Sequence, residues 1–457
     1  MRNLSPRIGI VGGGPGGLMT ALLLKQQLPN AEVTIFEASS RCGGKVHTNH
    51  FAVTGMRYEV GAAELYDYSH LGPDPLRKLI EDLGLSIAPM TGPGVIFDGR
   101  WLMTDHDLQG CLGEVGAAQV RAFETAARTD CTPAEYYESD WRSDLRDQNS
   151  NISFATHLDA VTDSKARRYI ETVVHSDLAT EPERTSALYG LQNWLMNDPD
   201  YMRLYYIEGG NDLLIDRILA RLDCSIRLQT RVQRISGNAQ SGYDLTVAAA
   251  NGSRTHHFDA VVVALPVNQL GLITWESPSL AAAIRSHRGH YDYPAHYLRI
   301  TLVFERAFWR DQFPGDYFMI DAFGGCCVYD ESARDPKATR GVLGWLLAGD
   351  AALVYANLSD RELVKLVLTE LPASVRHGAT TVIESAVHRW VGAVNGWPMG
   401  RPIQEPKRRH LVDPAQHPSF CLVGDYLFDS TLNGVLDSAE LAAKILGEWA
   451  EQSSLPR

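Results

Sequence analysis

Residues 7–37 read RIGIVGGGPGGLMTALLLKQQLPNAEVTIFE, in which a glycine-rich turn follows the first of two short apolar runs. The run that ends at Val11 predicts a strand, the periodicity of residues 18–27 predicts a helix, and residues 32–36 predict a second strand. The turn satisfies the G-x-G-x-x-G fingerprint of a dinucleotide-binding β-α-β unit through Gly12, Gly14 and Gly17.

This turn is suited to binding a pyrophosphate. Glycine permits a tight turn and a close backbone approach, while the helix N-terminus offers free N–H groups and partial positive charge. Glu37 ends the second strand about 20 residues after Gly17, where a carboxylate accepts hydrogen bonds from the ribose hydroxyls of an adenosine. We therefore predict that a dinucleotide binds over this turn.

The rest of the chain predicts a second domain interleaved with the first. Helical patterns occur at residues 112–130, 164–178 and 360–371, and strand-like runs at 225–228, 243–249, 260–265, 296–304 and 341–347. Residues 420–446 then return to the first domain. We predict a dinucleotide-binding domain made of residues 1–72, 205–270 and 380–457, and a substrate-binding domain made of residues 73–204 and 271–379.

Composition limits the classes of partner. The chain has 457 residues, a length that is too great for one ordinary core. Its apolar fraction of 45% is normal for a globular protein. The formal net charge of -13 argues against nucleic acid and anionic lipid, so a small-molecule substrate is expected. No leader-like start and no run of roughly 18 apolar residues is present, which predicts a cytoplasmic protein without integral membrane association. The seven cysteines include no C-x-x-C pair and no zinc-site spacing, so we expect reduced thiols and no metal.

Several later segments share a family pattern. Arg41-Cys-Gly43-Gly44-Lys45 resembles the end of an E-x-x-x-R-x-G-G-R motif that starts at Glu37, with lysine in the last place. Tyr58 to Ala62, Ile207 to Asn211, Arg231 to Ile235 and Leu422 to Val435 supply further matches. Together they resemble the flavin-containing amine oxidase superfamily, which includes monoamine and polyamine oxidases, histone lysine demethylases, protoporphyrinogen oxidase and phytoene-type desaturases.

The resemblance implies an α/β fold with a Rossmann-type FAD-binding domain interleaved with an α+β substrate-binding domain. Arg41 and the Gly43–Gly44 backbone would grip the FAD pyrophosphate, the Val232 backbone would meet the adenine, and Asp425 would reach the sugar-phosphate chain. The implied cofactor-binding residues are Gly12, Gly14, Gly17, Glu37, Arg41, Gly43, Gly44, Lys45, Gly61, Ala62, Val232, Gly424, Asp425, Gly434 and Val435. An NAD-dependent enzyme would explain only the first motif. No cysteine stands where monoamine oxidases attach the flavin, so FAD is expected to bind noncovalently.

Two positions depart from the family pattern. Arg299 stands where amine oxidases place a lysine beside the flavin N5, and arginine cannot serve as a titratable group near neutral pH. It could order a water, bind a polar group of the substrate, pair with an acid, or point to solvent from its strand. Glu64 stands where amino-acid oxidases hold the substrate carboxylate with arginine, so it favours an ammonium or amide N–H. The alternative for Glu64 is a surface carboxylate in a loop.

The aromatic cage of monoamine oxidases is incomplete. Thr431 replaces its C-terminal ring, while Trp390 or Trp397 could supply the other side, although core packing is an equal alternative. Of the aromatic residues before Gly209, we expect one or two to line the substrate cavity, and we select Tyr189. The predicted substrate-pocket residues are Tyr189, Trp397 and Thr431.

The resemblance implies oxidation of a C–N bond of an amine or amide to an imine, by hydride transfer to flavin N5 with O2 as acceptor. The departures from the family pattern at the lysine position and in the aromatic cage would fit a specialised substrate of a biosynthetic pathway. Arg299 and Glu64 are the predicted catalytic residues. Two alternatives stay open: an FAD-dependent C–C dehydrogenase like the protoporphyrinogen oxidase and phytoene desaturase branches, which lack the lysine, and a flavin-binding protein without turnover.

Overall fold

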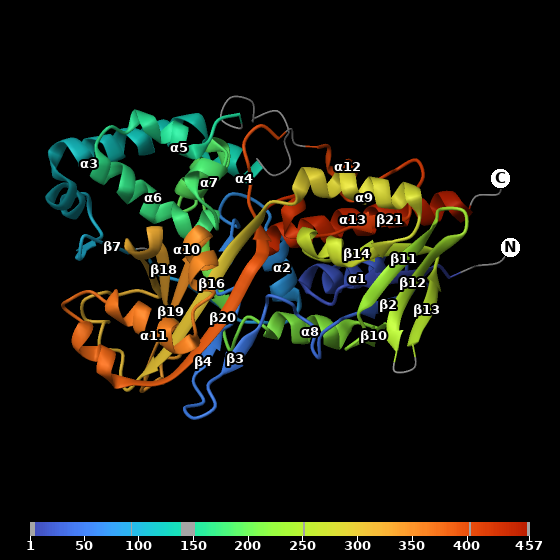
Figure 1. Ribbon diagram of the computed structural model, residues 1–457, viewed down its shortest axis with the longest axis horizontal. Coiled ribbons are helices and arrows are strands. Elements are labelled where there is room, and N and C mark those ends of the chain that lie inside the picture. Colours follow the sequence, from blue (N-terminus) through green and yellow to red (C-terminus); the bar gives the residue numbers. More distant parts are fainter. Residues whose placement is uncertain (1–4, 93, 139–150, 250–251, 402–403, 455–457) are drawn as a thin grey trace.

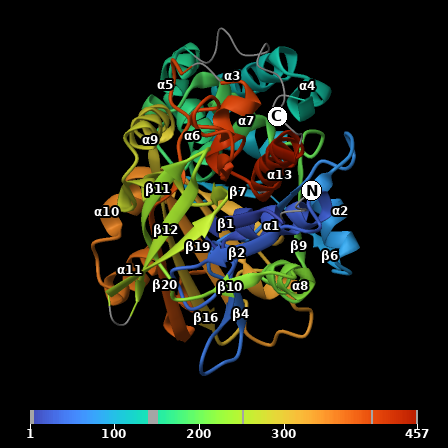
Figure 2. The same ribbon diagram turned by 90° about the vertical axis from the view of Figure 1, so that its right-hand side faces the viewer.

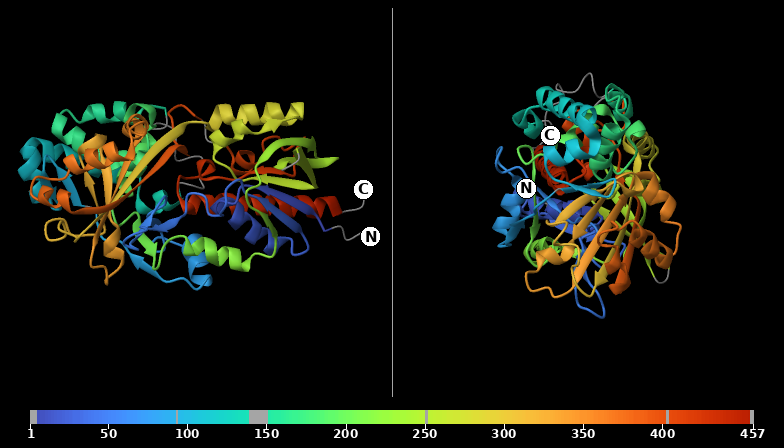
Figure 3. Two further views of the ribbon diagram at one scale, coloured as in Figure 1. Left: turned by 60° about the horizontal axis from the view of Figure 1, so that its bottom comes forward. Right: turned by 90° about the vertical axis from the view of Figure 1, so that its left-hand side faces the viewer.

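The computed structural model describes residues 5–92, 94–138, 151–249, 252–401 and 404–454. Figure 1 shows two parts along the long axis of the molecule. The part drawn on the right carries both chain ends, which also lie together in the left view of Figure 3.

The predicted β-α-β unit is the centre of a five-stranded sheet in that part. It consists of β1 (Arg7–Val11), α1 (Pro15–Gln27) and β2 (Glu32–Phe36). Later segments add β10 (Ser225–Arg227), β14 (Ala260–Val263) and β21 (Phe420–Leu422), which gives the order β10-β2-β1-β14-β21. Every pair in the sheet is parallel. A parallel sheet of this kind is buried on both faces, and the predicted α/β class is confirmed.

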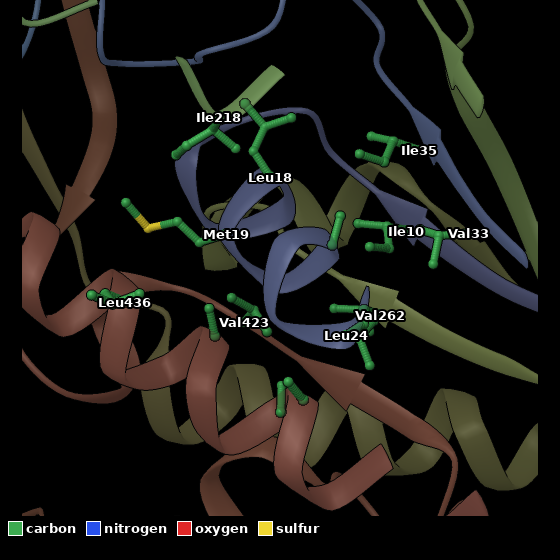
Figure 4. Close-up of a cluster of buried hydrophobic side chains, with 14 of the residues drawn as sticks. Ile10, Leu18, Met19, Leu24, Val33, Ile35, Ile218, Val262, Val423 and Leu436 are labelled. Atoms are coloured by element: carbon green, nitrogen blue, oxygen red, sulfur yellow. The ribbon is translucent and has the colours of Figure 1, made fainter. Parts of the chain in front are cut away.

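Helices cover one face of this sheet and a second sheet covers the other. α1 and α13 (Leu432–Ser454) lie side by side on the first face (Figure 2), with α8 (Leu213–Arg221) next to α1. Figure 4 shows Leu18 and Met19 of α1 packed among side chains of the strands, α8 and α13. The second sheet has the order β13-β12-β11-β15 and is built from β11 (Val232–Asn238), β12 (Gly242–Ala249), β13 (Gly252–Phe258) and β15 (Thr274–Trp275). α9 (Pro278–Tyr291) packs with it.

The other part is organised by a seven-stranded sheet with the order β20-β16-β19-β18-β17-β7-β8. Its strands are β7 (Gly94–Phe97), β8 (Arg100–Leu102), β16 (Pro294–Phe304), β17 (Tyr317–Ile320), β18 (Cys326–Asp330), β19 (Gly341–Ala348) and β20 (Val382–Asn395). One face packs on α3 (Asp105–Asp130), α6 (Ser164–Leu178) and α7 (Ala187–Leu195). The other packs on α10 (Gly349–Tyr355) and α11 (Asp360–Thr369). The predicted helices and strands of this part are confirmed.

The remaining elements are short. They are β3 (Thr48–His50), β4 (Arg57–Glu59), β5 (Leu65–Asp67), β6 (Ile87–Pro89), β9 (Arg203–Ile207), α2 (Pro75–Asp82), α4 (Pro133–Glu138), α5 (Phe154–His157) and α12 (Pro406–His410). No helix in the described ranges combines the length and apolar character needed to cross a membrane.

The packing differs from the predicted domain boundaries in three places. β20 pairs along its length with β16, so residues 382–395 belong to the seven-stranded sheet and not to the dinucleotide-binding part. α2 and α9 do the reverse, because their apolar faces pack into the cores of the dinucleotide-binding part. Periodicity identifies the buried face of an element but not the core that covers it, which explains the differences.

Candidate functional site

A cavity of about 690 Å³ runs from the glycine-rich turn to β16 and β18. Its walls come from the turn, the segments after β2 and β4, the end of β14, the end of β20 and the start of α13. This volume lies within the range of small-molecule and cofactor sites. The cavity therefore brings together segments from the whole length of the chain.

The three glycines of the fingerprint have different structural roles. Gly12 has φ +108°, and a Cβ there would overlap the carbonyl oxygen of Ala264, while a Cβ on Gly17 would overlap that of Gly12. These two positions serve close helix–strand packing. Gly14 lines the cavity, and the nearest atom to an added Cβ would be the Gly44 Cα at 4.0 Å. It is the N-cap of α1, and no side chain caps the helix.

The N-terminus of α1 therefore faces the cavity with backbone groups and no competing side chain. Such a terminus attracts phosphate through its N–H groups and its dipole. The residues present fit a dinucleotide pyrophosphate at this place.

Glu37 and Arg41 both line the cavity and brace the loops around it. The Glu37 carboxylate accepts hydrogen bonds from the backbone N–H groups of Gly13 at 2.8 Å and Ser39 at 2.7 Å. Arg41 donates to the carbonyl oxygens of Cys42 at 3.0 Å and Gly44 at 2.8 Å. The contacts seen are within the loops, so a ribose contact of Glu37 and a phosphate contact of Arg41 stay predictions.

Lys45 links three segments at the cavity wall. Its Nζ donates to the Asp425 carboxylate at 3.0 Å and to the Ala393 carbonyl oxygen at 2.7 Å. The predicted cofactor residues Gly44, Gly61, Ala62, Gly424 and Val435 also line the cavity.

Four of the other predicted cofactor residues lie outside the lining: Gly12 and Gly17, treated above, with Gly43 and Gly434. A Cβ on Gly434 would overlap the Asp429 carbonyl oxygen, and one on Gly43 would lie 2.8 Å from the Val46 carbonyl oxygen. These glycines shape the walls rather than touch the cavity. Val232 also lies outside, because its side chain packs in the core beneath the four-stranded sheet.

Arg299 lies at the far end of the cavity and is completely buried. The predicted alternation is confirmed, since Leu298 and Ile300 pack on the opposite face of β16. The guanidinium is ion-paired with Glu331, and its Cζ lies 4.8 Å from the centre of the Tyr329 ring. Its Nε and Nη1 have no hydrogen-bond partner within the described chain. The alternative of a solvent-facing strand residue is therefore wrong.

Glu64 lies at the same end, and the alternative of a surface carboxylate is also wrong. Its Oε2 is buried and has no hydrogen-bond partner within the described ranges. Burial raises the pKa of the Glu64 carboxyl, while a hydrogen bond with Tyr329 and the charges of Arg299 and Arg334 act in the opposite direction. Glu64, Arg299 and Tyr329 line one cavity wall together.

The aromatic residues predicted to line the substrate pocket lie in different cavities of the structure. Trp390 lines the large cavity and donates from Nε1 to the Val60 carbonyl oxygen at 2.8 Å. Trp397 lies in a smaller pocket instead, where its ring centre is 5.9 Å from that of Tyr189. This pocket does not include Thr431, but it shares Tyr189, Gln192, Asn395 and Asp429 with the space that Thr431 lines, so a substrate contact of Trp397 stays a prediction.

Tyr189 and Thr431 line a second chamber of about 240 Å³ that adjoins the large cavity. The two spaces share five lining residues, Tyr66, Tyr297, Val394, Ser430 and Thr431. Tyr66 and Tyr297 were not predicted as site residues. A signal existed for Tyr297, because it stands two residues from Arg299 on the same strand, and side chains two apart on a strand share a face.

The second chamber also holds carboxylates that sequence reasoning missed: Asp74, Asp177, Asp429 and Asp437. Burial is the main cause that raises the pKa of each. They are spread over α2, α6 and the segment around the start of α13, so no local motif groups them.

A dinucleotide-binding fold whose cavity adjoins a second, polar chamber defines a protein that binds a dinucleotide cofactor beside a small-molecule pocket. The family described as flavin-containing amine oxidoreductase matches residues 15–446, and the chain belongs to this family. It is therefore a flavin-dependent oxidoreductase, as the resemblance implied.

The chain is similar to several oxidases of differing substrate class. It is 25% identical to polyamine oxidase 2 of Arabidopsis thaliana over 408 residues, which cover 86% of this chain and 77% of that protein. It is 26% identical to an L-amino-acid oxidase of Siganus canaliculatus over 409 residues, covering 81% and 70%. A solved structure of putrescine oxidase bound to putrescine covers 96% of this chain and 98% of its own with a TM-score of 0.77 and 18% identity, which establishes the shared fold.

Proposed function

We propose that this protein binds FAD noncovalently and oxidises a C–N bond of an amine to an imine, with O2 as the final acceptor. In balance, the amine loses two electrons and two protons, O2 gains them as hydrogen peroxide, and water hydrolyses the imine to a carbonyl compound. FAD, when bound, supplies the acceptor for the substrate hydride. The family membership and the dinucleotide cavity support the cofactor.

The observation that carries the amine assignment is Glu64. Its Oε2 is buried in the cavity wall without a partner, and a buried carboxylate oxygen that lacks a donor is costly unless a ligand supplies one. An amine nitrogen supplies such a donor. Burial also raises the pKa of Glu64, which makes this carboxylate a better base for the proton that a bound ammonium must lose.

Arg299 is proposed to orient a water or a polar substrate group. Its Nε and Nη1 are unpartnered, whereas Nη2 is held by Glu331. The Glu331 carboxylate balances the positive charge, so Arg299 offers directed N–H donors rather than a free cation. An arginine whose charge is already balanced is less suited to binding a substrate carboxylate. The pair therefore favours an amine over an α-amino acid as the substrate.

The test is anaerobic reduction of the purified yellow protein, followed as bleaching of the flavin absorbance. The substrate panel contains polyamines, aryl amines, amino acids, amides, polyisoprenoids and porphyrinogens. Bleaching by nitrogen compounds supports the proposal, while bleaching only by polyisoprenoids or porphyrinogens establishes the C–C dehydrogenase alternative. No bleaching by any compound, with FAD bound, supports the alternative of a flavin protein without turnover.

Glu64→Gln tests the residue assignment. We expect its reduction rate to fall by about 100-fold or more at unchanged FAD content, because the amide cannot accept a proton. Glu276→Gln removes a half-exposed carboxylate and is the matched control. An unchanged rate in Glu64→Gln would remove Glu64 from the mechanism.

A further inference from the structure

A cluster of five charged side chains lies between the large cavity and a smaller cavity of about 190 Å³. Glu64 and Arg299 line the large cavity, whereas Glu59, Glu331 and Arg334 line the smaller one. The two cavities have no lining residue in common among the described residues. Because Arg299 is ion-paired with Glu331, the charges nevertheless form one continuous group across the wall.

Within this cluster, Glu331 is shared by two arginines. Its Oε1 accepts from Nη2 of Arg299, and its Oε2 lies 3.5 Å from Nη1 of Arg334. The same Nη1 lies 4.0 Å from Oε1 of Glu59. Glu59 is 3% exposed and the Arg334 side chain 9% exposed, so water screens these charges weakly.

Arg334 is held by charge and not by hydrogen bonds. None of its three guanidinium nitrogens has a hydrogen-bond partner within the described chain. Burial acts to lower the pKa of this guanidinium, but the negative charges of Glu331, Glu59 and Glu64 lead the causes that raise it. Arg334 is therefore a counter-ion that several acids share.

The charges of the cluster do not balance. With all five side chains ionised, two arginines face three carboxylates, which leaves one negative charge in excess. A buried excess charge is costly, and one added proton removes it. Glu331 is the least suited to hold this proton, because two flanking cations favour its ionised form. The proton therefore belongs to Glu59 or Glu64.

Glu59 is the acid on the side of the smaller cavity. It accepts hydrogen bonds from Thr48 Oγ1 at 2.9 Å and from the backbone N–H of Asn211 at 3.0 Å. Burial raises the pKa of its carboxyl to about 7, with the charge of Arg334 acting downward and that of Glu331 upward. The remaining titratable side chains in the lining of this cavity are His50, Arg57, Tyr58, Tyr206 and Asp335.

Glu64 is the acid on the side of the large cavity. Burial raises the pKa of its carboxyl, while the charges of Arg299 and Arg334 act downward. The other titratable groups within reach of its charge are Tyr66, Asp177, Tyr297, Tyr317, Cys327 and Tyr329. None of these six is a cation, so the two arginines are the positive charges on which Glu64 depends.

We propose that Glu59 and Glu64 share one proton through their common counter-ion Arg334, so that Glu59 releases its proton when Glu64 accepts one. The release clause rests on the proposed amine oxidation. There the substrate ammonium gives a proton to the Glu64 carboxylate, the charge of Arg334 becomes available to Glu59, and one proton leaves Glu59. The step moves no electrons, and the number of protons in the cluster stays constant.

The smaller cavity gives the released proton a way out. Its lining includes the exposed residues His50, Gly55 and Gly209, so the space beside Glu59 reaches the surface. Glu59 is thus a positioning acid that acts on Glu64 through Arg334. It does not itself line the cavity in which substrate and cofactor are proposed to bind.

Glu64→Gln tests the sharing of the proton, because the neutral amide imitates the protonated acid. The FAD-loaded protein is labelled at the glutamate carboxyl carbons, and nuclear magnetic resonance follows each carboxyl signal against pH. The Glu59 signal is identified by its loss in Glu59→Gln. We expect the titration midpoint of Glu59 to fall by at least about one pH unit in Glu64→Gln. Glu276→Gln, which removes a half-exposed carboxylate, should leave the midpoint unchanged.

The release of the proton is tested by the pH profile of flavin reduction with the amine that bleaches the flavin fastest. The parent profile should contain an ionisation near pH 7 that Glu59→Gln lacks. A loss of stability alone would lower the rate at every pH and would not remove an ionisation from the profile.

The two measurements separate this inference from amine oxidation. An unchanged Glu59 midpoint in Glu64→Gln, at parental FAD content and melting temperature, overturns the shared proton whatever the protein oxidises. A shifted midpoint supports the shared proton even if no amine bleaches the flavin, in which case amine oxidation itself is wrong. If amines do bleach the flavin, a parental pH profile in Glu59→Gln overturns the release of the proton from Glu59.

Discussion

The buried Arg299–Glu331 pair is the residue-scale feature with the largest expected effect on stability. Both side chains are almost fully inaccessible to solvent. Removing one partner of such a pair leaves an uncompensated buried charge and costs about 3–5 kcal/mol. We expect Glu331→Gln to lower the free energy of unfolding by this amount in urea titrations.

The matched control for this prediction is Glu276→Gln, which breaks the half-exposed pair with Arg234. Exposed pairs contribute about 0–1 kcal/mol. Equal losses in the two variants would contradict the argument that burial sets the cost at Glu331.

Asp437 gives a residue-scale prediction about pH. Burial and neighbouring acids raise the pKa of its carboxyl to about 7, from 3.8 in an unfolded chain. The folded state therefore binds the proton more tightly, so the free energy of unfolding falls as pH rises from about 4 to about 7 and is level above. Asp437→Asn removes this loss, and we expect it to be more stable than the parent by roughly 1–3 kcal/mol at pH 8.

The measurement is chemical unfolding of the apo protein at pH 5 and pH 8. The gain from Asp437→Asn should be clearly smaller at pH 5 than at pH 8, because most of the loss in the parent accrues between pH 5 and pH 7. Asp311→Asn should show no such pH-dependent gain. A variant less stable than the parent at pH 8 would mean that Asp437 has a stabilising partner.

At the scale of elements, different glycines of the glycine-rich turn serve helix packing and cofactor binding. A Cβ on Gly17 would overlap the Gly12 carbonyl oxygen, whereas a Cβ on Gly14 would point into open cavity space. Gly14 also has φ -74°, which alanine adopts without strain. We expect Gly14→Ala to fold normally but to bind FAD at least about 10-fold more weakly, as followed by flavin fluorescence.

Gly17→Ala is the contrasting variant. Overlap with backbone forces α1 away from β1, and we expect a loss of roughly 3 kcal/mol or more in urea unfolding. If Gly14→Ala retained full FAD affinity, the pyrophosphate would not approach the turn at this point.

The elements themselves were largely predictable, while their partners were not. Period-2 alternation correctly placed Arg299 opposite Leu298 and Ile300, yet it could not say whether that face met solvent or protein. The answer depends on Glu331, which lies 32 residues later in the chain and reaches Arg299 only because β18 and β19 extend the sheet. The position of Trp397 could not be predicted for a related reason, since it depends on the path of the chain beyond β20.

At the scale of the whole molecule, the cavity wall joins parts that are distant in sequence. Lys45 near the start of the chain is bonded to Asp425 near its end and to Ala393 at the end of β20. No local pattern encodes such an arrangement, which explains why the acids of the second chamber were missed. Only the family resemblance brought the first and last motifs into one predicted site.

A cofactor held by such distant segments should stabilise them together. A ligand that binds only the folded state adds RT ln(1 + [L]/Kd), or about 2.7 kcal/mol at a concentration 100 times Kd. We expect the melting temperature of the apo protein to rise continuously with added FAD. Asp425→Asn should reduce this rise, because an amide no longer balances the Lys45 charge at the point where three segments meet. The control Asp311→Asn should leave the rise in melting temperature unchanged. A melting temperature that does not change when FAD is added would contradict a cofactor site spanning these segments.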